Sequence, residues 1–222
     1  MKKLADGLYQ LRGFPPNAIN VFLMGDVLVD AATRHAGGRI LRQLRGRRVA
    51  AHTLTHAHPD HQGASREICE SLGIPLWCGE HDVHAMETRD FGQADHFLNR
   101  LIDRVWAGPP HPVARALREG EEVAGFEVLD VPGHSPGHVA YWREADRTLI
   151  AGDVFNNMNL ITGIPGLHEP PRIFTIDPAR NRESARRLAG LEPALVCFGH
   201  GPPLRDPIRL RRFAAGLERA AS

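Results

Sequence analysis

The chain has 222 residues, of which 42% are hydrophobic, and its formal net charge at pH 7 is +1. A chain of this length can bury about 70% of the surface that it exposes when unfolded, so we predict one substantial core and a single domain over residues 1–222. The near-zero net charge provides no long-range field for a polyanion, which argues against a nucleic-acid partner.

Cysteine usage and hydropathy point to the inside of the cell. Cys69, Cys78 and Cys197 form no C-x-x-C pair and leave one thiol over in any disulfide scheme, which is typical of a reducing compartment. Residues 1–7 carry a basic pair with no apolar stretch after it, so no signal peptide is predicted. No apolar run approaches the roughly 18 residues of a membrane span. We expect a cytoplasmic protein with no membrane partner, and the sequence leaves its oligomeric state open.

Short strands and helices alternate along the chain. Apolar runs bounded by Gly, Pro or Asp predict strands, at residues 8–11, 19–24, 27–29, 49–55, 75–78, 122–131, 139–142 and 148–151. Helical spacing of apolar residues predicts helices, at residues 38–44, 62–72 and 80–86. Two Asp-Pro pairs, Asp177-Pro178 and Asp206-Pro207, each combine an N-cap residue with a proline at the first helical position, and predict two further helices.

Two stretches between these elements are candidates for a lid over a binding site. Residues 87–119 contain apolar residues at helical spacing and are predicted to form a helical insertion, for which plain packing is the commoner explanation. Residues 156–175 are rich in Gly and Pro and too long for a simple turn. Trp106 in the first stretch and His168 in the second are candidate substrate contacts.

Residues 56–61, with the sequence H-A-H-P-D-H, pack three imidazoles and a carboxylate into one short segment. The apolar strand predicted before this segment would place His56 and His58 on the same side by alternation. The proline cannot continue a strand, so Asp60 and His61 are expected in the turn that leads to the next helix. Imidazole nitrogens and carboxylate oxygens suit zinc and other borderline divalent metals, and two pairs of ligands can hold two ions.

Three later motifs complete the pattern. Residues 128–134 are predicted to form a strand that ends at a Pro-Gly turn before His134, residues 148–153 form an apolar strand that ends in Gly-Asp, and residues 197–201 carry His200. Together with the H-x-H-x-D-H segment, these motifs resemble the metallo-β-lactamase-fold hydrolase superfamily over nearly the whole chain. The resemblance implies an α/β (α+β) fold, the four-layer αββα sandwich, in which helices cover both outer faces of two packed sheets.

The resemblance also implies seven metal ligands, which form two sites joined by a bridging carboxylate. The implied ligands of the first metal are His56, His58 and His134. Those of the second metal are Asp60, His61 and His200, and Asp153 would be the bridge. Many true β-lactamases of the superfamily have a cysteine ligand where Asp153 stands, so the chain looks more like the glyoxalase-II, lactonase and phosphodiesterase members. Asp30 matches an acidic position beneath the metals, where it would orient one of their ligands.

The implied cofactors are two divalent metal ions, zinc in the first place, with iron or manganese as alternatives. A hydroxide bridging the two ions would be the nucleophile, since a bound metal lowers the pKa of water from about 15.7 to about 7. Asp60 would orient this nucleophile and pass its proton to the leaving group. The predicted function is a binuclear metal-dependent hydrolase that acts on a small-molecule ester, thioester or lactone.

Three other functions remain open. A mononuclear iron sulfur dioxygenase of the same fold would use a subset of these ligands, and the identity of the metal would separate it. A phosphodiesterase or nuclease of this fold would be expected to carry extra nucleic-acid-binding modules, whereas only 22 residues follow His200. A non-catalytic metal-binding module is disfavoured, because structural zinc sites are closed by four ligands and are seldom paired through a carboxylate.

Two further histidines are predicted to be structural. His138 follows His134 by four residues and is expected in the core or beside a ligand, and His52 lies within the strand predicted at 49–55. The remaining histidines show no paired spacing and are expected at the surface; they are His35, His81, His84, His96 and His111.

Overall fold

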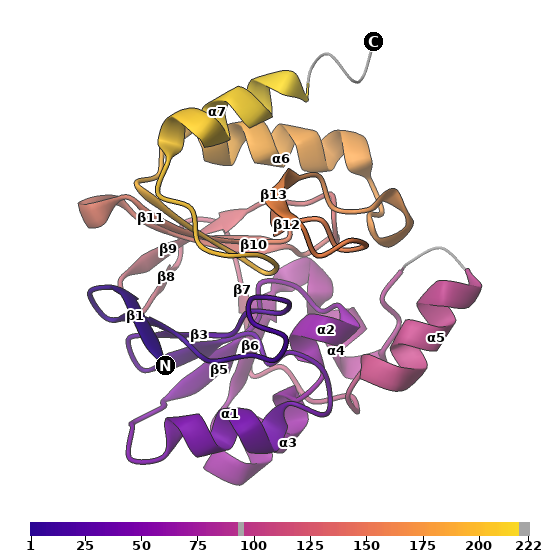
Figure 1. Ribbon diagram of the computed structural model, residues 1–222. Coiled ribbons are helices and arrows are strands. Elements are labelled where there is room, and N and C mark those ends of the chain that lie inside the picture. The colour runs from indigo at the N-terminus through magenta and orange to yellow at the C-terminus, as the bar shows by residue number, and fades with distance from the viewer. Residues whose placement is uncertain (93–95, 218–222) are drawn as a thin grey trace.

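Two β-sheets pack face to face in the computed structural model, which describes residues 1–92 and 96–217, and helices cover both outer faces (Figure 1). Side chains of both sheets meet in the space between them, among them Phe22, Val29, Phe126 and Tyr141, all of which are buried. The removal of this apolar surface from water is the main favourable contribution to folding. The αββα sandwich expected from the sequence is confirmed.

The first sheet has seven strands in the order of the sequence. They are β1 (Lys2–Ala5), β2 (Leu8–Gln10), β3 (Phe22–Met24), β4 (Val27–Val29), β5 (Ala51–Thr53), β6 (Leu76–Gly79) and β7 (Arg115–Leu117). The first four pair antiparallel, and the strands from β4 onward run parallel. Because β4 and β5 are parallel, their carboxyl ends lie at the same edge of the sheet.

The second sheet has five strands in the order β14-β11-β10-β9-β8. In chain order they are β8 (Glu122–Val123), β9 (Phe126–Asp130), β10 (Val139–Arg143), β11 (Thr148–Gly152) and β14 (Leu195–Phe198). β10 is antiparallel to both β9 and β11, whereas β14 is parallel to β11. The strands β9, β11 and β14 therefore run in one direction, and their carboxyl ends meet at one edge.

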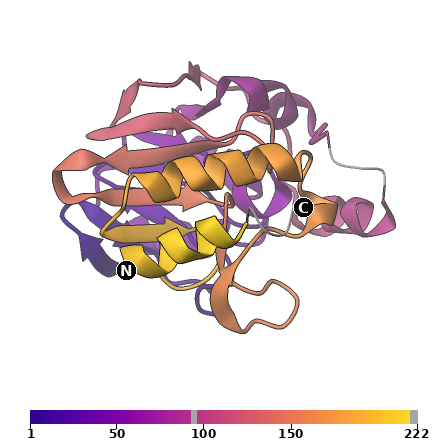
Figure 2. The ribbon, with the colours of Figure 1, turned by 90° about the horizontal axis from the view of Figure 1, so that it is seen from above.

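Two pairs of helices form the outer layers. The first sheet is covered by α1 (Gly37–Leu44) and α3 (Ser65–Leu72), whose Ile40 and Ile68 belong to the same buried cluster as Leu23 and Leu28 of the strands. The second sheet is covered by α6 (Pro178–Gly190) and α7 (Pro207–Gly216), which lie side by side in Figure 2. Both of the latter begin at a predicted Asp-Pro pair, where the aspartate side chain accepts the backbone amide three residues later.

Most of the remaining elements lie near the edge where β9, β11 and β14 end. They are α2 (Pro59–Gln62), α4 (Val83–Thr88), α5 (Phe97–Trp106) and the 3-10 turns η1 (Glu80–Asp82) and η3 (Arg172–Phe174). The 3-10 turn η2 (Glu144–Asp146) joins β10 to β11 at the opposite edge. α5 contacts α2, and the hairpin of β12 (Asn156–Met158) and β13 (Pro165–His168) projects beyond the sheets in Figure 2. Within residues 1–92 and 96–217, no helix is both long and apolar enough to cross a membrane.

Several predicted elements have different boundaries in the structure, and three of them differ most. The strand expected at 49–55 is paired only over β5, and the helix expected at 62–72 is divided into α2 and α3. The division falls at Gly63, which packs so closely on the loop after β4 that a Cβ atom would lie 2.3 Å from the backbone nitrogen of Arg34. The strand expected at 122–131 is a hairpin of β8 and β9, because Ala124 and Gly125 both have positive φ angles.

Candidate metal centre

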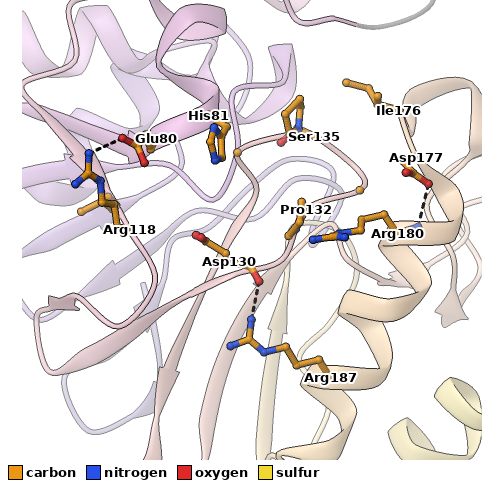
Figure 3. A pocket seen from close by; sticks show the side chains of 14 residues that line it. Glu80, His81, Arg118, Asp130, Pro132, Ser135, Ile176, Asp177, Arg180 and Arg187 are labelled. Carbon is orange, nitrogen blue, oxygen red and sulfur yellow. Dashed lines mark hydrogen bonds and ion pairs between the residues drawn. The ribbon is translucent and has the colours of Figure 1, made fainter.

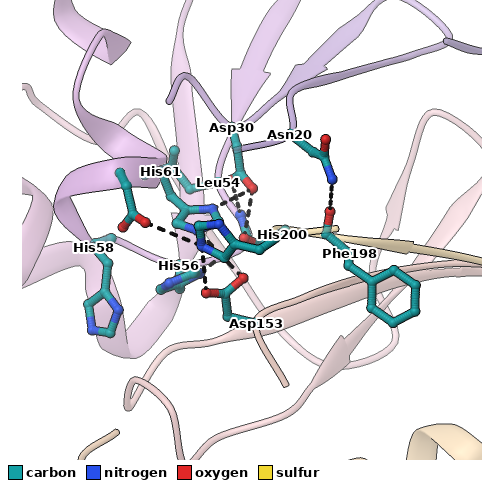
Figure 4. Close-up of polar contacts among 12 residues, drawn as sticks. Asn20, Asp30, Leu54, His56, His58, His61, Asp153, Phe198 and His200 are labelled. Atoms are coloured by element: carbon teal, nitrogen blue, oxygen red, sulfur yellow. Dashed lines mark hydrogen bonds and ion pairs between the residues drawn. The ribbon is translucent and has the colours of Figure 1, made fainter. Parts of the chain in front are cut away.

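Seven side chains converge where the strand ends of the two sheets meet. Figure 4 shows His56, His58, His61, Asp153 and His200 of this group. The seven are His56, His58, Asp60, His61, His134, Asp153 and His200. The first four come from the loop after β5 and from α2, and the other three follow β9, β11 and β14. The parallel directions of β9, β11 and β14 thus bring segments that are far apart in the sequence to one place.

Within this group, three sets of three residues have potential ligand atoms within 4.8 Å of one another. The sets are His56, His58 and His134; Asp60, His61 and His200; and His56, His61 and Asp153. The first two are the ligand triads predicted from the sequence, and the third joins them through the carboxylate predicted as the bridge. The role of these residues as metal ligands stays a prediction, with which their geometry agrees.

The carboxylate of Asp153 lies between the two triads. Its Oδ2 is 3.1 Å from His200 Nε2 and 3.7 Å from His134 Nε2, and its Oδ1 is 3.6 Å from His61 Nε2. One carboxylate thus faces an imidazole of the first triad and two of the second. The absence of a side chain at Gly199 permits this approach, because a Cβ atom there would lie 2.0 Å from Asp153 Oδ1.

Asp30 orients two of the imidazoles from beneath the centre. Its Oδ1 accepts the amide of Thr55 at 2.7 Å, and its Oδ2 accepts the hydroxyl of Thr55 at 2.9 Å and Nδ1–H of His61 at 2.9 Å. Because the Thr55 hydroxyl gives its one proton to Asp30, it accepts from Nδ1 of His56, 3.1 Å away. Both imidazoles are left with Nε2 facing the centre. The role of Asp30 beneath bound metals stays a prediction, with which these contacts agree.

Two further imidazoles are oriented in the same way. Nδ1 of His134 lies 3.1 Å from the hydroxyl of Thr175, which itself donates to the carbonyl of Pro171 and must therefore accept from the ring. Nδ1 of His200 donates to the carbonyl of Ala18. In each case the lone pair of a neutral imidazole is on Nε2, the atom that faces Asp153.

The donor atoms at the centre fit divalent metal ions. Nε2 of His56 and of His61 and Oδ1 of Asp153 are buried and have no hydrogen-bond partner among the described residues. Buried polar atoms in folded proteins are almost always paired, so such a cluster calls for a ligand. Nitrogen and oxygen donors that carry no proton are the ligands that zinc and similar ions prefer.

His58 faces the centre through its other ring nitrogen. Its Nδ1 lies 2.9 Å from His134 Nε2. Since the proton of a neutral His134 is on Nδ1, either one proton or a cation must lie between these two nitrogens. This geometry places the lone pairs of the first triad around one point.

Electrostatics differ between the two triads. Burial lowers the pKa of His58 to about 4, and burial together with the neighbouring imidazoles lowers the pKa of the other two histidines of the first triad. At His200 burial also disfavours the charged form, but Asp153 and Asp60 outweigh it and raise the pKa to about 10. The first triad therefore offers neutral imidazoles, whereas the second contains the carboxylate of Asp60 and lies beside that of Asp153, and both carboxylates require positive charge near them.

A buried carboxylate that the sequence patterns did not single out connects the two ligand loops. Asp82 of η1 accepts the Ala57 amide at 2.9 Å and the Ser135 hydroxyl at 2.8 Å with Oδ2, and the Gly137 amide at 2.7 Å with Oδ1. Ala57 lies between two candidate ligands, and Ser135 directly follows a third. Asp82 is an ordinary helix-start residue by its local pattern, so only its long-range contacts reveal this role.

Two details of the predicted placement were wrong. His56 and His58 face the centre from a loop and not through alternation along a strand, since β5 ends before them. Asp60 and His61 lie in the short helix α2 and not in a turn. Pro59 begins this helix at a position where no backbone amide is needed, which explains how a proline can precede both ligands directly.

The two histidines expected to be structural are so. Nε2 of His138 accepts the backbone amide of Asp153 at 3.0 Å, so this ring supports the backbone of a candidate ligand. Nδ1 of His52 donates to a carbonyl of β4 and its Nε2 accepts from Ser65 of α3, so this ring faces the outer helix layer. Of the five histidines expected at the surface, four are exposed and His111 is half-buried.

The candidate centre forms the floor of a cavity of about 660 Å³. Trp106 lines this cavity together with Leu98 and Ile102 of the same helix, α5. Part of the apolar surface of α5 is thus turned toward the cavity. His168 pairs with Asn156 in the hairpin β12–β13 and is not among the described residues that line the cavity.

A second cavity, of about 670 Å³, lies beside the loop after β9 and is lined by charged side chains (Figure 3). Arg118 pairs with Glu80 at 2.6 Å, and Arg187 donates to the carbonyl of Asp130 at 2.8 Å. In the part of the chain that the structure describes, no metal-ligand cluster lies there. The candidate metal ligands of the described residues therefore lie at the first cavity.

Comparison with known proteins agrees with this geometry. The model of the metallo-beta-lactamase superfamily matches residues 15–200. The probable metallo-hydrolase YflN of Bacillus subtilis (strain 168) is 30% identical over 200 residues, which cover 80% of this chain and 76% of that protein. A hydroxyacylglutathione hydrolase of Bdellovibrio bacteriovorus is 28% identical over 185 residues, which cover 78% of this chain and 60% of that protein.

Solved structures are similar over most of the chain. The metallo-beta-lactamase family protein TTHA1429 from Thermus thermophilus has a TM-score of 0.69 and 27% identity, covering 99% of this chain and 80% of that one. TTHA1623, solved in a di-iron-bound form, has a TM-score of 0.61 and 30% identity, covering 92% and 93%. The chain belongs to the metallo-β-lactamase superfamily, and its relatives and its histidine-rich centre are those of a metal-dependent hydrolase.

Proposed function

We propose that the protein is a binuclear metal-dependent hydrolase of small esters, thioesters or lactones. The observation that carries this proposal is the pair of largely buried candidate triads, which Asp153 joins at the floor of one cavity. The relatives named hydroxyacylglutathione hydrolase support hydrolysis of an acyl compound. The di-iron-bound form of TTHA1623 supports two ions, and leaves zinc, iron and manganese as candidates.

The residues of the chain bind, orient and move protons. Two divalent ions, when bound, would supply a Lewis acid for the scissile carbonyl and a water of lowered pKa. Asp30, Thr175 and the Ala18 carbonyl hold the imidazoles so that Nε2 faces the centre. This fixed geometry would hold the ions, and with them the reacting groups, at the cavity floor.

Asp60 is the residue to which we assign proton transfer. Its carboxylate lines the cavity and lies 3.2 Å from His200 Nε2. Burial would raise the pKa of Asp60, but the neighbouring His61 and His200 outweigh it and lower the pKa below its ordinary value. Asp60 is therefore a carboxylate at neutral pH, and it can take a proton from the attacking water and give it to the leaving group.

No side-chain nucleophile is needed for this chemistry. Among the described residues that line the cavity there is neither a serine nor a cysteine. All three cysteines are buried, and burial raises the pKa of Cys69 and of Cys197 to about 12, so these thiols carry no charge at neutral pH. The free thiols also support the cytoplasmic location that we propose, and the size of the cavity supports a small-molecule substrate.

Hydrolysis by metal-replete and chelator-treated protein tests the proposal. A panel of a thioester, an ester, a lactone, a phosphodiester and a β-lactam would be offered to both preparations. We expect turnover of at least one of the first three, loss of that turnover on chelation and its recovery when Zn²⁺, Fe²⁺ or Mn²⁺ is restored. Turnover that survives chelation, or turnover confined to the phosphodiester, would overturn the proposal.

A further inference from the structure

The walls above the candidate centre are apolar. Twenty described residues line the cavity; fourteen of them have apolar side chains, five are candidate metal ligands, and the last is Thr33. There is no Lys or Arg among these described lining residues. The polar groups are thus concentrated at the floor, where the reaction takes place, and the rest of the surface can bind only apolar groups favourably.

Several separate segments supply these walls, and the one around η3 contributes Ile173 and Phe174. α5 contributes Leu98 and Ile102, the hairpin loop between β12 and β13 contributes Leu160 and Ile161, and the turn after β2 contributes Phe14. Phe14 and Ile161 are both 89% exposed, so large apolar side chains also surround the entrance. Soluble proteins rarely expose such a group of side chains unless it contacts a partner or a ligand.

We infer that the substrate carries an uncharged apolar acyl group of several carbons, which lies along α5 and the hairpin loop while its carbonyl reaches the centre. This inference rests on the proposed function. Water adds its oxygen to the acyl carbon, the carbon–oxygen or carbon–sulfur bond breaks, and a proton passes to the departing alcohol or thiol. No oxidant or reductant takes part.

The same walls disfavour an anionic leaving group such as glutathione. A glutathione moiety carries carboxylates, and removing a carboxylate from water without a cation beside it is costly. The described lining offers no cationic side chain to compensate. The chain therefore differs in specificity from its relatives named hydroxyacylglutathione hydrolase.

Dependence on acyl length is the first test. Linear acyl groups from acetyl to octanoyl, joined to one neutral thiol, would be hydrolysed by the metal-replete protein. Burial of each additional methylene should raise kcat/KM on the order of threefold until the cavity is filled. A profile that is flat or falls from acetyl onward would overturn the inference and leave the proposed function intact.

Substitutions in the walls have matched controls on the same elements. Leu98→Glu and Ile161→Glu place a charge in the cavity, whereas Leu101→Glu and Ile164→Glu alter side chains that are 45% and 63% exposed and do not line it. We expect the first pair to lower kcat/KM for the octanoyl thioester at least tenfold, with a smaller loss for acetyl, and the second pair to stay within twofold of wild type. Equal losses in both pairs would contradict the assignment.

One further comparison tests the preference for the leaving group independently of the preference for the acyl group. A second distinguishes failure of this inference from failure of the proposed function. The octanoyl thioester of a neutral thiol should be hydrolysed at least tenfold faster than that of glutathione, and equal rates would refute the exclusion of anionic leaving groups. If no acyl compound is hydrolysed, the proposed function fails. Calorimetric binding of unreactive N-methylamides then decides the inference, since affinity should rise with acyl length and an independence of length would overturn it.

Discussion

The imidazoles of the candidate centre are directed by residues that lie behind them. Asp30 receives Nδ1–H of His61, and the Thr175 hydroxyl receives that of His134. Each of these contacts fixes both the ring orientation and the tautomer, and leaves the lone pair on the nitrogen that faces Asp153. The chemistry of the site is thus decided as much by hydrogen bonds on its far side as by the candidate ligands.

Among single residues, Asp60 carries the most specific prediction. Asp60→Asn keeps the size of the side chain but removes the carboxylate that would accept and return the proton. We expect hydrolysis to fall by about 10²- to 10⁴-fold, the range typical of lost general acid–base catalysis. Steady-state kinetics on the metal-replete variant measure this effect, with metal content determined in the same sample.

The control for Asp60 is the simultaneous replacement of all three cysteines by serine. Because Cys69, Cys78 and Cys197 are buried and uncharged at neutral pH, this variant should hydrolyse the same substrate at a rate close to that of wild type once it is shown to fold. Unchanged turnover in Asp60→Asn, or abolished turnover in a folded, metal-loaded cysteine variant, would refute the assigned roles.

At the scale of elements, η1 holds two ligand loops together through Asp82. Asp82→Asn replaces one acceptor oxygen by an amide that must face a backbone N–H or the Ser135 hydroxyl. We expect the affinity of the first metal site to fall about 10- to 100-fold, the usual effect of losing a group that supports a ligand. Competition titration with a zinc chelator measures the affinity.

A control for Asp82 is Asp206→Asn at the N-cap of α7, where asparagine caps as well as aspartate. This variant should bind metal as wild type does. If Asp82→Asn also retained wild-type affinity while its circular dichroism spectrum stayed unchanged, the carboxylate would not position the ligand loops.

β5 is tied to its neighbours by His52, and this contact predicts a pH dependence of stability. Burial lowers the pKa of His52 to about 4, whereas the unfolded value is 6.5. Below 6.5 the unfolded chain therefore binds a proton that the folded chain does not. The contribution of His52 to the free energy of unfolding is therefore fully present above pH 6.5. It is lost as the pH falls toward 4, and the loss amounts to about 3 kcal/mol.

The slope of unfolding free energy against pH isolates the contribution of His52. His52→Gln removes the titrating group, so between pH 6.5 and 4 its slope should be smaller than that of wild type by up to about 1.4 kcal/mol per pH unit. Urea denaturation at several pH values provides both slopes, and the comparison does not depend on absolute stability. Parallel slopes in the two proteins would show that His52 does not titrate in this range.

At the scale of the whole molecule, local sequence patterns predict the elements whose signals are local. The Asp-Pro pairs mark the starts of α6 and α7, and the apolar run at 27–29 coincides with β4. The candidate ligands were found because a dense H-x-H-x-D-H segment, with later Gly-Asp and Gly-His motifs, is specific. The structure brings all seven to one place.

The elements that the sequence patterns did not predict depend on tertiary contacts. β7 and β14 are short and pair with strands far away in the chain, and β1 is an edge strand that begins with two exposed lysines. The role of Asp82 and the orientation of α5 toward the cavity are likewise set by packing between segments. Periodicity can show that α5 has an apolar face, but it cannot show what that face contacts.

Metal content, measured together with hydrolysis in wild-type protein and in Asp153→Ala, tests the central claim most directly. We expect close to two divalent ions per chain in the metal-replete wild type. In the variant, which removes the carboxylate shared by both triads, we expect one ion or fewer and a sharp loss of hydrolysis with an unchanged circular dichroism spectrum. One iron per wild-type chain with oxygen-dependent turnover, or full occupancy and activity in Asp153→Ala, would contradict a binuclear hydrolytic centre.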